Sequence, residues 1–332
     1  MTEVVWSRLG VEDCLRFRDL APGSVVHVRP GASFDPDLPP MAGQLLHDGD
    51  EACFVPRFAF VDGTAYGVVV DGSATTVIVR PRADLPSTAE VVAVHPTGDM
   101  VPRNLLRFYV TFSAPMREGC AAGHVGLFSD AGKEMVGALL ATEHELWDGD
   151  RRRLTVLLDP ARIKRGLVGH LKTGYPLRQG GAFTLVIDPG FRDARGTPLR
   201  SRYERRYEVE GDERGLVEPD HWDLSVPRSH TREPFEVGFD RSLDFGLLGR
   251  CLHVDGPDGR RVEGSPEIGP CERSWRLQPA TPWPPGLHRL VVNPILEDVA
   301  GNSVDRVFDR DLTRREDEPR RAGAIARSFQ PR

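Results

Sequence analysis

One short phrase recurs three times along the chain and restricts the folds that are open to it. A glycine turn leads into an apolar or alternating run at residues 63–71, 180–188 and 286–293. Runs of this length that are rich in β-branched residues and begin at a glycine are typical of β-strands. The repeat therefore predicts a chain built from copies of one strand-rich unit.

The spacing of other landmarks supports the same repeat. In the first and third copies a proline, at position 56 or 279, lies seven residues before the repeated glycine, whereas the middle copy has 20 residues in that interval. The difference predicts an insertion in the middle copy. In the second and third copies, 20 residues separate the end of a phenylalanine-bearing strand from the next hairpin glycine, at Gly132 and Gly259. Agreement at independent intervals argues against coincidence.

Short strands with turns at regular spacing predict antiparallel β-sandwiches. We therefore expect an all-β chain of tandem sandwiches in an elongated arrangement. The charged, proline-bearing segments 81–90 and 210–219 are interpreted as tight linkers. The expected parts are a divergent N-terminal β domain at 1–88, a sandwich at 89–211 with an insertion at 161–178, a sandwich at 212–312, and a loosely ordered basic tail at 313–332. Two apolar residues of this tail, Ile325 and Phe329, are able to dock back on the preceding domain.

Composition excludes several classes of protein. A hydrophobic content of 39% over 332 residues is enough to form real cores, which excludes wholesale disorder. A formal net charge of −6 gives no global attraction to nucleic acid, and no apolar run is long enough for a membrane-spanning helix. The first ten residues lack the pattern of a signal peptide, which at face value indicates the cytoplasm or a trimmed chain.

The cysteines leave the redox compartment open. There are five, an odd number, and none forms a CxxC pair, so neither a zinc site nor a complete disulfide framework is expected. We interpret them as free and mostly buried thiols. In an oxidising compartment, Cys14 would be able to pair with Cys53, and Cys251 with Cys271.

No segment carries the pattern of a catalytic, cofactor or metal site. The chain has no GxSxG, HExxH or P-loop motif, and no GxGxxG before a helix, so we expect no catalytic residue, no cofactor and no metal. Two clusters contain possible metal ligands. The first, Glu143, His144, Glu145 and Asp148, is interpreted as a polar hairpin rim. The second, Glu297, Asp298, Asn302 and Asp305, suits calcium, but an aspartate three residues before a glycine also forms a tight capped loop.

The insertion at 161–178 is the most unusual segment. It is locally basic, which makes it a candidate recognition loop for an acidic partner or a phosphate-bearing ligand; the alternative is a crossover with a solvated basic face. Its basic residues are Arg162, Lys164, Arg165, His170, Lys172 and Arg178. The five tryptophans, at positions 6, 147, 222, 275 and 283, are expected in cores or at interfaces, although exposed ones would stack on sugars. No histidine has a sequence neighbour that forms a nucleophile–base pair.

Several phrases resemble bacterial Ig-like domains of the surface-layer (SbsA) type. In the second copy the resembling segments are residues 91–98, 101–104, 110–116, 180–187 and 193–196. The third copy keeps 235–243, 285–286 and 298–302, and the resemblance covers residues 89–311 well and 25–80 loosely. It implies an Ig-like fold for the domains at 1–88, 89–211 and 212–312, as in spacers or adhesion modules of secreted or cell-surface proteins. The matching positions are turns and core residues, so they carry little functional specificity.

The leading hypothesis is a non-enzymatic structural or protein-interaction scaffold, because every repeated residue serves the fold. Two alternatives stay open. One is a module that binds a glycan or an anionic surface through the 161–178 insertion, and the other is a set of accessory domains for a hydrolytic or surface complex whose catalytic part is on another chain. The middle core is expected to contain Phe108, Val110, Phe112, Leu154, Val156, Phe183, Leu185 and Ile187.

Overall fold

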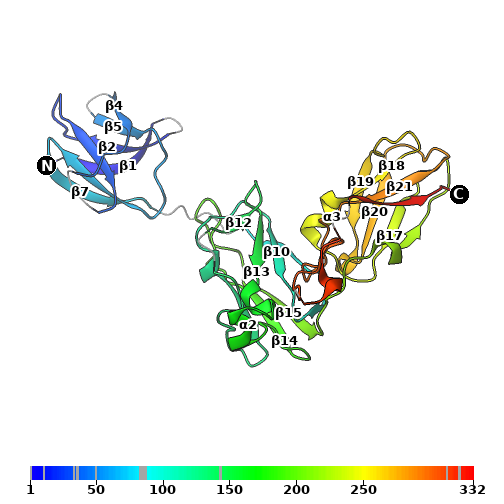
Figure 1. Ribbon diagram of the computed structural model, residues 1–332. Helices are drawn as coiled ribbons and strands as arrows, with labels where there is room; N and C mark the ends of the chain where they lie inside the picture. Colours follow the sequence, from blue (N-terminus) through cyan, green and yellow to red (C-terminus); the bar gives the residue numbers. More distant parts are fainter. Residues whose placement is uncertain are drawn as a thin grey trace. The chain divides into compact units, whose positions relative to one another are not determined.

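The computed structural model describes residues 2–9, 12–32, 34, 37–48, 51–81, 88–141, 144–311, 313–320 and 323–332. The chain is nearly all-β and divides into two compact units, residues 1–86 and 87–332 (Figure 1). In the described part, no helix is both long and apolar enough to span a membrane.

The first unit is one β-sandwich. Its core lies between two sheets and includes Leu15, Phe17, Phe54, Tyr66 and Val68. One sheet has the order β1-β2-β5-β4 and the other β3-β6-β7. The strands are β1 (Glu3–Leu9), β2 (Glu12–Arg18), β3 (Val26–Pro30), β4 (Gly43–Asp48), β5 (Glu51–Pro56), β6 (Ala65–Val70) and β7 (Ser73–Val79).

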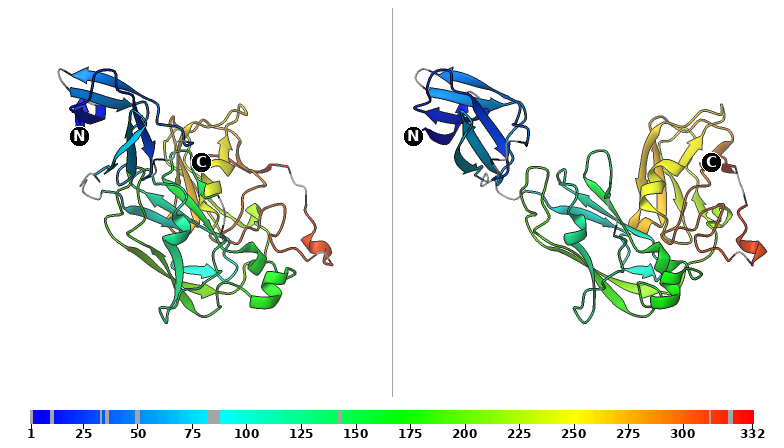
Figure 2. Two further views of the ribbon diagram at one scale, coloured as in Figure 1. Left: turned by 90° about the vertical axis from the view of Figure 1, so that its left-hand side faces the viewer. Right: turned by 60° about the vertical axis from the view of Figure 1, so that its left-hand side comes forward.

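The second unit begins with a sandwich that carries the predicted insertion. Its sheets have the orders β12-β13-β10-β8 and β11-β14-β15-β9, with β9 parallel to β15. The strands are β8 (Val91–His95), β9 (Met100–Pro102), β10 (Arg107–Phe112), β11 (Val125–Ser129), β12 (Leu146–Trp147), β13 (Arg153–Leu157), β14 (Ala182–Ile187) and β15 (Tyr203–Glu210). The insertion forms α1 (Pro160–Ile163) and α2 (Val168–Thr173), drawn in green in Figure 2.

A third sandwich completes the second unit. Its sheets have the orders β16-β17-β20-β19 and β18-β21-β22. The strands are β16 (Asp223–Ser225), β17 (Phe235–Gly238), β18 (Leu252–Asp255), β19 (Gly264–Ile268), β20 (Ser274–Pro279), β21 (His288–Val292) and β22 (Ile325–Phe329), and α3 (Phe245–Cys251) precedes β18. Short 3-10 turns are η1 (Ala121–Gly123), η2 (Pro219–His221), η3 (Pro270–Glu272) and η4 (Arg315–Asp317).

The three sandwiches share one strand order. In each, the first, second, fifth and fourth strands form one sheet, and the third, sixth and seventh form the other; β9 is an addition in the second sandwich. This is the order of an Ig constant-type domain, with its ABED and CFG sheets. The repeated glycine phrases become β6, β14 and β21, the sixth strand of each sandwich. The prediction of an all-β chain of tandem Ig-like sandwiches is confirmed.

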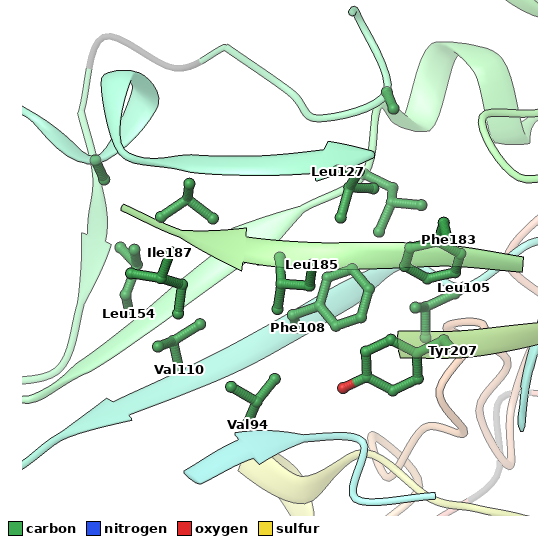
Figure 3. Packing of buried hydrophobic residues seen from close by; sticks show 14 of the residues in the cluster. Val94, Leu105, Phe108, Val110, Leu127, Leu154, Phe183, Leu185, Ile187 and Tyr207 are labelled. Carbon is green, nitrogen blue, oxygen red and sulfur yellow. The ribbon is translucent and has the colours of Figure 1, made fainter. Parts of the chain in front are cut away.

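The middle core also matches its prediction closely. Seven of the eight expected residues are buried with at most 2% of their surface exposed, and Val156 is partly buried against them. Figure 3 shows Phe108 and Val110 from one sheet facing Phe183, Leu185 and Ile187 from the other. Period-two alternation identified these residues because successive side chains on a strand point to opposite faces.

The end of the chain corrects one prediction. Residues 313–332 were expected to form a loosely ordered tail, but β22 lies within them and pairs with β21 through five residues (Figure 1). Phe329 is buried in the third core and stacks on Phe235 with the ring centroids 4.1 Å apart. Ile325 and Phe329 dock back on the third core, as the sequence allowed, but the surrounding arginines gave no strand pattern for this segment, which is the seventh strand of its sandwich.

Candidate functional site

The most elaborate polar structure in the chain joins the second and third sandwiches inside the second unit. Tyr109, on the outward face of β10, donates its hydroxyl proton toward both carboxylate oxygens of Asp244, over 2.8 and 2.9 Å. Arg107, from the same face of β10, forms ion pairs with Asp244 and Glu297. Asp244 is 2% exposed and Tyr109 7%. A carboxylate from one sandwich is therefore neutralised by side chains from the other.

Burial controls the protonation of these groups. It raises the pKa of Asp244, and Arg107 and the Tyr109 hydroxyl act in the opposite direction. Burial and the Asp244 charge raise the pKa of Tyr109, so its hydroxyl stays a proton donor at neutral pH. The pKa of Glu297 is also raised by burial and lowered in part by Arg107. Arg107 is thus shared between two carboxylates whose charges water does not solvate well.

The local structure of α3 places Asp244 at this joint. Asp244 is the N-cap of the helix and accepts a hydrogen bond from the Leu247 amide over 3.0 Å. A Cβ atom on Gly246 would lie 2.7 Å from the Tyr109 hydroxyl oxygen, closer than such contacts occur. Glycine in the first turn therefore allows the tyrosine to reach the capping carboxylate.

A second buried carboxylate lies nearby. Glu272 is 1% exposed and accepts hydrogen bonds from the amide and the hydroxyl of Thr97, at 2.9 to 3.0 Å. The Nδ1 atom of His95 lies 2.7 Å from the same carboxylate, and the His95 ring stacks on Phe245 at a centroid distance of 3.5 Å. Glu272 and its neighbour Cys271 have φ values of 53° and 56°. A left-handed backbone at two successive non-glycine residues is strained, and it turns Glu272 into the second sandwich.

Amide side chains and backbone groups join the sandwiches beside these charges. Asn104 donates to the Glu213 carbonyl over 2.7 Å and accepts from the Glu213 amide over 2.9 Å. Asn302 donates to the same carbonyl over 3.0 Å. The Leu106 amide donates to the Val299 carbonyl over 3.0 Å. Residue 213, in the predicted linker 210–219, is thus held from both sides.

An outer chain of alternating charges completes the joint. Arg103 pairs with Asp212, Arg214 bridges Asp212 and Asp309 at 2.8 and 2.7 Å, and Arg165 pairs with Asp309 at 2.8 Å. Burial acts to raise the pKa of Asp212, but the hydrogen bonds and charges of Arg103 and Arg214 outweigh it and lower the pKa to about 2. We call these contacts, together with those of Asp244, Glu272 and Glu213, the polar joint.

The polar joint is suited to fixing an orientation. Its carboxylates pair with arginines or accept hydrogen bonds from hydroxyl and amide groups. Buried ion pairs add little net stability but penalise arrangements in which the partners do not meet. The chemistry is therefore that of a specific junction.

The predicted recognition loop is partly absorbed into the same junction. Arg162 donates to the carbonyls of Gly137, Gly174 and Tyr175, which holds the insertion together. Lys164 lies over the ring of Phe308 at 4.5 Å, and Arg165 pairs with Asp309. The Nδ1 atom of His170 also lies 2.5 Å from the Arg162 carbonyl oxygen. Four of the six basic side chains are therefore engaged within the unit.

Neither candidate metal cluster is assembled. Among the described residues no group of three or more His, Cys, Asp or Glu side chains converges. In the first cluster, Glu143 lies outside the described residues, His144 is exposed, and Asp148 accepts from the amides of Arg152 and Arg153, as on a hairpin rim.

The second cluster is dispersed among separate partners. Asp298 accepts hydrogen bonds from the Ala300 and Asn302 amides and from the Asn302 side chain. Asp193 caps the equivalent loop of the second sandwich by accepting from the amides of Arg195 and Thr197. Glu297 pairs with Arg107 instead. The expectation that these aspartates cap tight loops is confirmed.

The tryptophans and cysteines mostly serve the cores. Trp222, Trp275 and Trp283 are at most 2% exposed, while Trp6 and Trp147 are partly buried against other aromatic rings. All five cysteines are free thiols. Cys14, Cys53 and Cys251 are buried, and Cys120 and Cys271 are partly exposed.

Sequence reasoning missed most residues of the polar joint, and it named Arg165 and Glu297 only for other roles. Arg107 and Tyr109 alternate with the core residue Phe108 and were read only as outward-facing positions. A tyrosine on the outward face of a central strand was the available signal, because large aromatic groups there indicate that the face is covered. Glu272 gave no signal, since its burial depends on the left-handed turn at 271–272.

Comparisons with known proteins add little to this picture. The sequence matches no protein-family model and no curated protein. Similar solved structures include the titin I-band fragment, at 8% identity over 88% of this chain and 92% of that one, with a TM-score of 0.23. A second is the complex of Dpr2 with DIP-Theta, at 10% identity over 96% of this chain and 92% of that one, with a TM-score of 0.21. A third is native alpha-2-macroglobulin from Escherichia coli, at 14% identity over 87% of this chain and 91% of that one, with a TM-score of 0.19. Because these TM-scores are low, the Ig-like assignment rests on strand order.

Proposed function

We propose that this chain is a non-enzymatic scaffold whose second unit presents two Ig-like sandwiches to protein partners in one fixed relative orientation. The observation that carries the proposal is the burial of Asp244 and Glu272, each held by side chains from the opposite sandwich. A flexible tether would need no such matching of buried groups. Rotation at the joint would break several charge-assisted hydrogen bonds together.

The fixed orientation is tested by residual dipolar couplings measured on the full chain. Couplings from the second and third sandwiches should fit one common alignment tensor. Arg107→Glu places a third negative charge beside Asp244 and Glu297, so this variant should need two tensors while each sandwich keeps its own internal fit. Arg206→Glu, on the exposed face of β15, is the matched control. A wild-type chain that needs separate tensors for the two sandwiches contradicts the proposal.

We also propose the finer family assignment, to bacterial Ig-like domains of the surface-layer type, and the domain limits 89–211 and 212–332. The segment 110–116 supports the family assignment, because this segment covers the end of β10 and the turn that follows the strand. Protease treatment of intact cells of the native host tests the surface location that this family implies. Complete protection of the chain would count against it.

The ligand-binding alternative would use the basic insertion. Lys172 and Arg178 are exposed, whereas Arg162, Lys164 and the surface residue Arg165 form contacts with other parts of the unit. The scaffold proposal accounts for the occupied side chains, and we therefore prefer it.

A further inference from the structure

The second and third sandwiches differ at one equivalent core position. In the pairing of the second and fifth strands, Val110 faces Leu154 in the second sandwich, and Val237 faces Trp275 in the third. Leu154 and Trp275 therefore occupy the same place in the repeated fold. The indole of Trp275 is 1% exposed and fills the third core. A leucine fills less of the same space.

The fourth strand differs as well. In the third sandwich β19 pairs with β20 over five successive residues. In the second, the described residues of β12 that pair with β13 are Leu146 and Trp147, and the Leu140 amide donates to the Leu157 carbonyl. The bridge between Leu139 and Leu158 is shifted by four residues from the register of Leu146 and Trp147, so the two pairings do not belong to one continuous ladder.

The smaller side chain and the interrupted strand coincide with a pocket between the two sheets. It has a volume of about 270 Å³, and residues of β11, β12 and β13 line it. Its inner wall includes Leu127 and Leu154, and its mouth carries three exposed apolar side chains, Val136, Leu140 and Leu146. The corresponding pocket of the third sandwich, beside Trp275, measures about 190 Å³.

The charge of the pocket is negative. Its charged lining residues are Glu134 and Glu145. The Glu145 carboxylate accepts hydrogen bonds from the Ala121 amide and from the Trp147 indole over 2.7 Å, and these neutral donors leave its charge uncompensated. Within the described part of the chain, no ion pair is formed with either glutamate. An occupant with a cationic group would supply the missing charge.

We propose that this pocket binds an aromatic side chain of a partner protein, carried on a segment with a lysine or arginine next to it. The aromatic group follows from Trp275, which packs at the equivalent core position of the third sandwich and leaves a smaller pocket there, of about 190 Å³ against about 270 Å³ beside Leu154; the cation follows from Glu134 and Glu145. The inference rests on the proposed scaffold function and names the chemistry of a partner. Aromatic anchors seated in apolar pockets are the residues that carry most of the binding energy at protein interfaces.

The probe is the capped tripeptide Ac-Lys-Trp-Lys-NH₂, titrated into the ¹⁵N-labelled full chain. We expect amide shifts at Gly126 and Leu127, and weaker or no shifts with Ac-Glu-Trp-Glu-NH₂ at the same concentration. Leu154→Trp should raise the Kd at least tenfold by filling the pocket from inside. Glu134→Lys should raise it several-fold, whereas Glu267→Lys, on β19 of the third sandwich, should leave it unchanged.

Three results overturn the proposal: equal shifts with both peptides, binding that survives Leu154→Trp, or binding of free indole as tight as that of the basic peptide. The last would indicate a pocket for small apolar molecules. If Leu154→Trp does not fold, Glu134→Lys and the acidic peptide still decide the question. A negative outcome leaves the dipolar couplings of the two sandwiches unaffected, so it is distinguishable from failure of the scaffold proposal.

Discussion

The hydroxyl of Tyr109 in the second sandwich lies 2.8 and 2.9 Å from the two carboxylate oxygens of Asp244 in the third. Asp244 also caps α3, so one carboxylate both begins a helix and receives the side chain of a neighbouring domain. A change in the relative position of the sandwiches would therefore disturb the start of α3. The joint and the fold of the third sandwich are coupled through this residue.

Removing the Tyr109 hydroxyl should destabilise the second unit. Tyr109→Phe deletes a hydrogen bond to a buried charged acceptor, which costs about 1.5–3 kcal/mol of unfolding free energy. Urea denaturation followed by tryptophan fluorescence measures the loss. Tyr203→Phe, on the partly buried β15 position, should change stability by less than half as much. Equal effects of the two variants would contradict a special role for the contact.

Two glycines of α3 should respond to alanine in opposite directions. Gly246→Ala places a Cβ atom 2.7 Å from the Tyr109 hydroxyl oxygen and should cost about 1–3 kcal/mol through overpacking. Gly249→Ala meets no atom within 4 Å and should gain about 0.5–1 kcal/mol from helix propensity. Thermal unfolding of both variants tests the pair. A stabilising Gly246→Ala would mean that the joint is more open than described.

Acid should weaken the outer part of the joint. The pKa of Asp212 is lowered to about 2 in the folded chain, so the folded state favours the ionised form. The stability that follows is present above the ordinary aspartate pKa and is lost as the pH falls from about 4 towards 2; it amounts to about 1–2 kcal/mol. Asp212→Asn should flatten the pH dependence of unfolding free energy in that window. An unchanged slope would show that Asp212 is not the responsible group.

The thiols should react in an order set by burial. Burial, aided by the neighbouring Cys53 thiol, raises the pKa of Cys14, so its reactive thiolate form is scarcer than that of an ordinary cysteine. Iodoacetamide should modify the partly exposed Cys271 and Cys120 first, as read by mass spectrometry. Cys14, Cys53 and Cys251 should react only after unfolding. Early labelling of Cys14 in folded protein would contradict its burial.

Parts of the fold were predictable because they follow from local pattern. The alternation of Phe108, Val110 and Phe112 identified a core strand, and the glycines at 132 and 259 adopt the positive φ of 71° and 75° that their hairpins require. The strand β22 escaped because its neighbours are charged, and its pairing with β21 comes from a segment more than 30 residues away.

The sequence by itself determined the class of fold, the strand repeat and the loops that Asp193 and Asp298 cap, because each depends on residues close together in the chain. Only the tertiary structure decided that Tyr109 meets Asp244, that His95 meets Glu272, and that Leu154 borders a larger pocket than Trp275 does. These relationships join residues more than 100 positions apart or compare two copies of a repeat. Their energies depend on burial and mutual geometry, which no local pattern encodes.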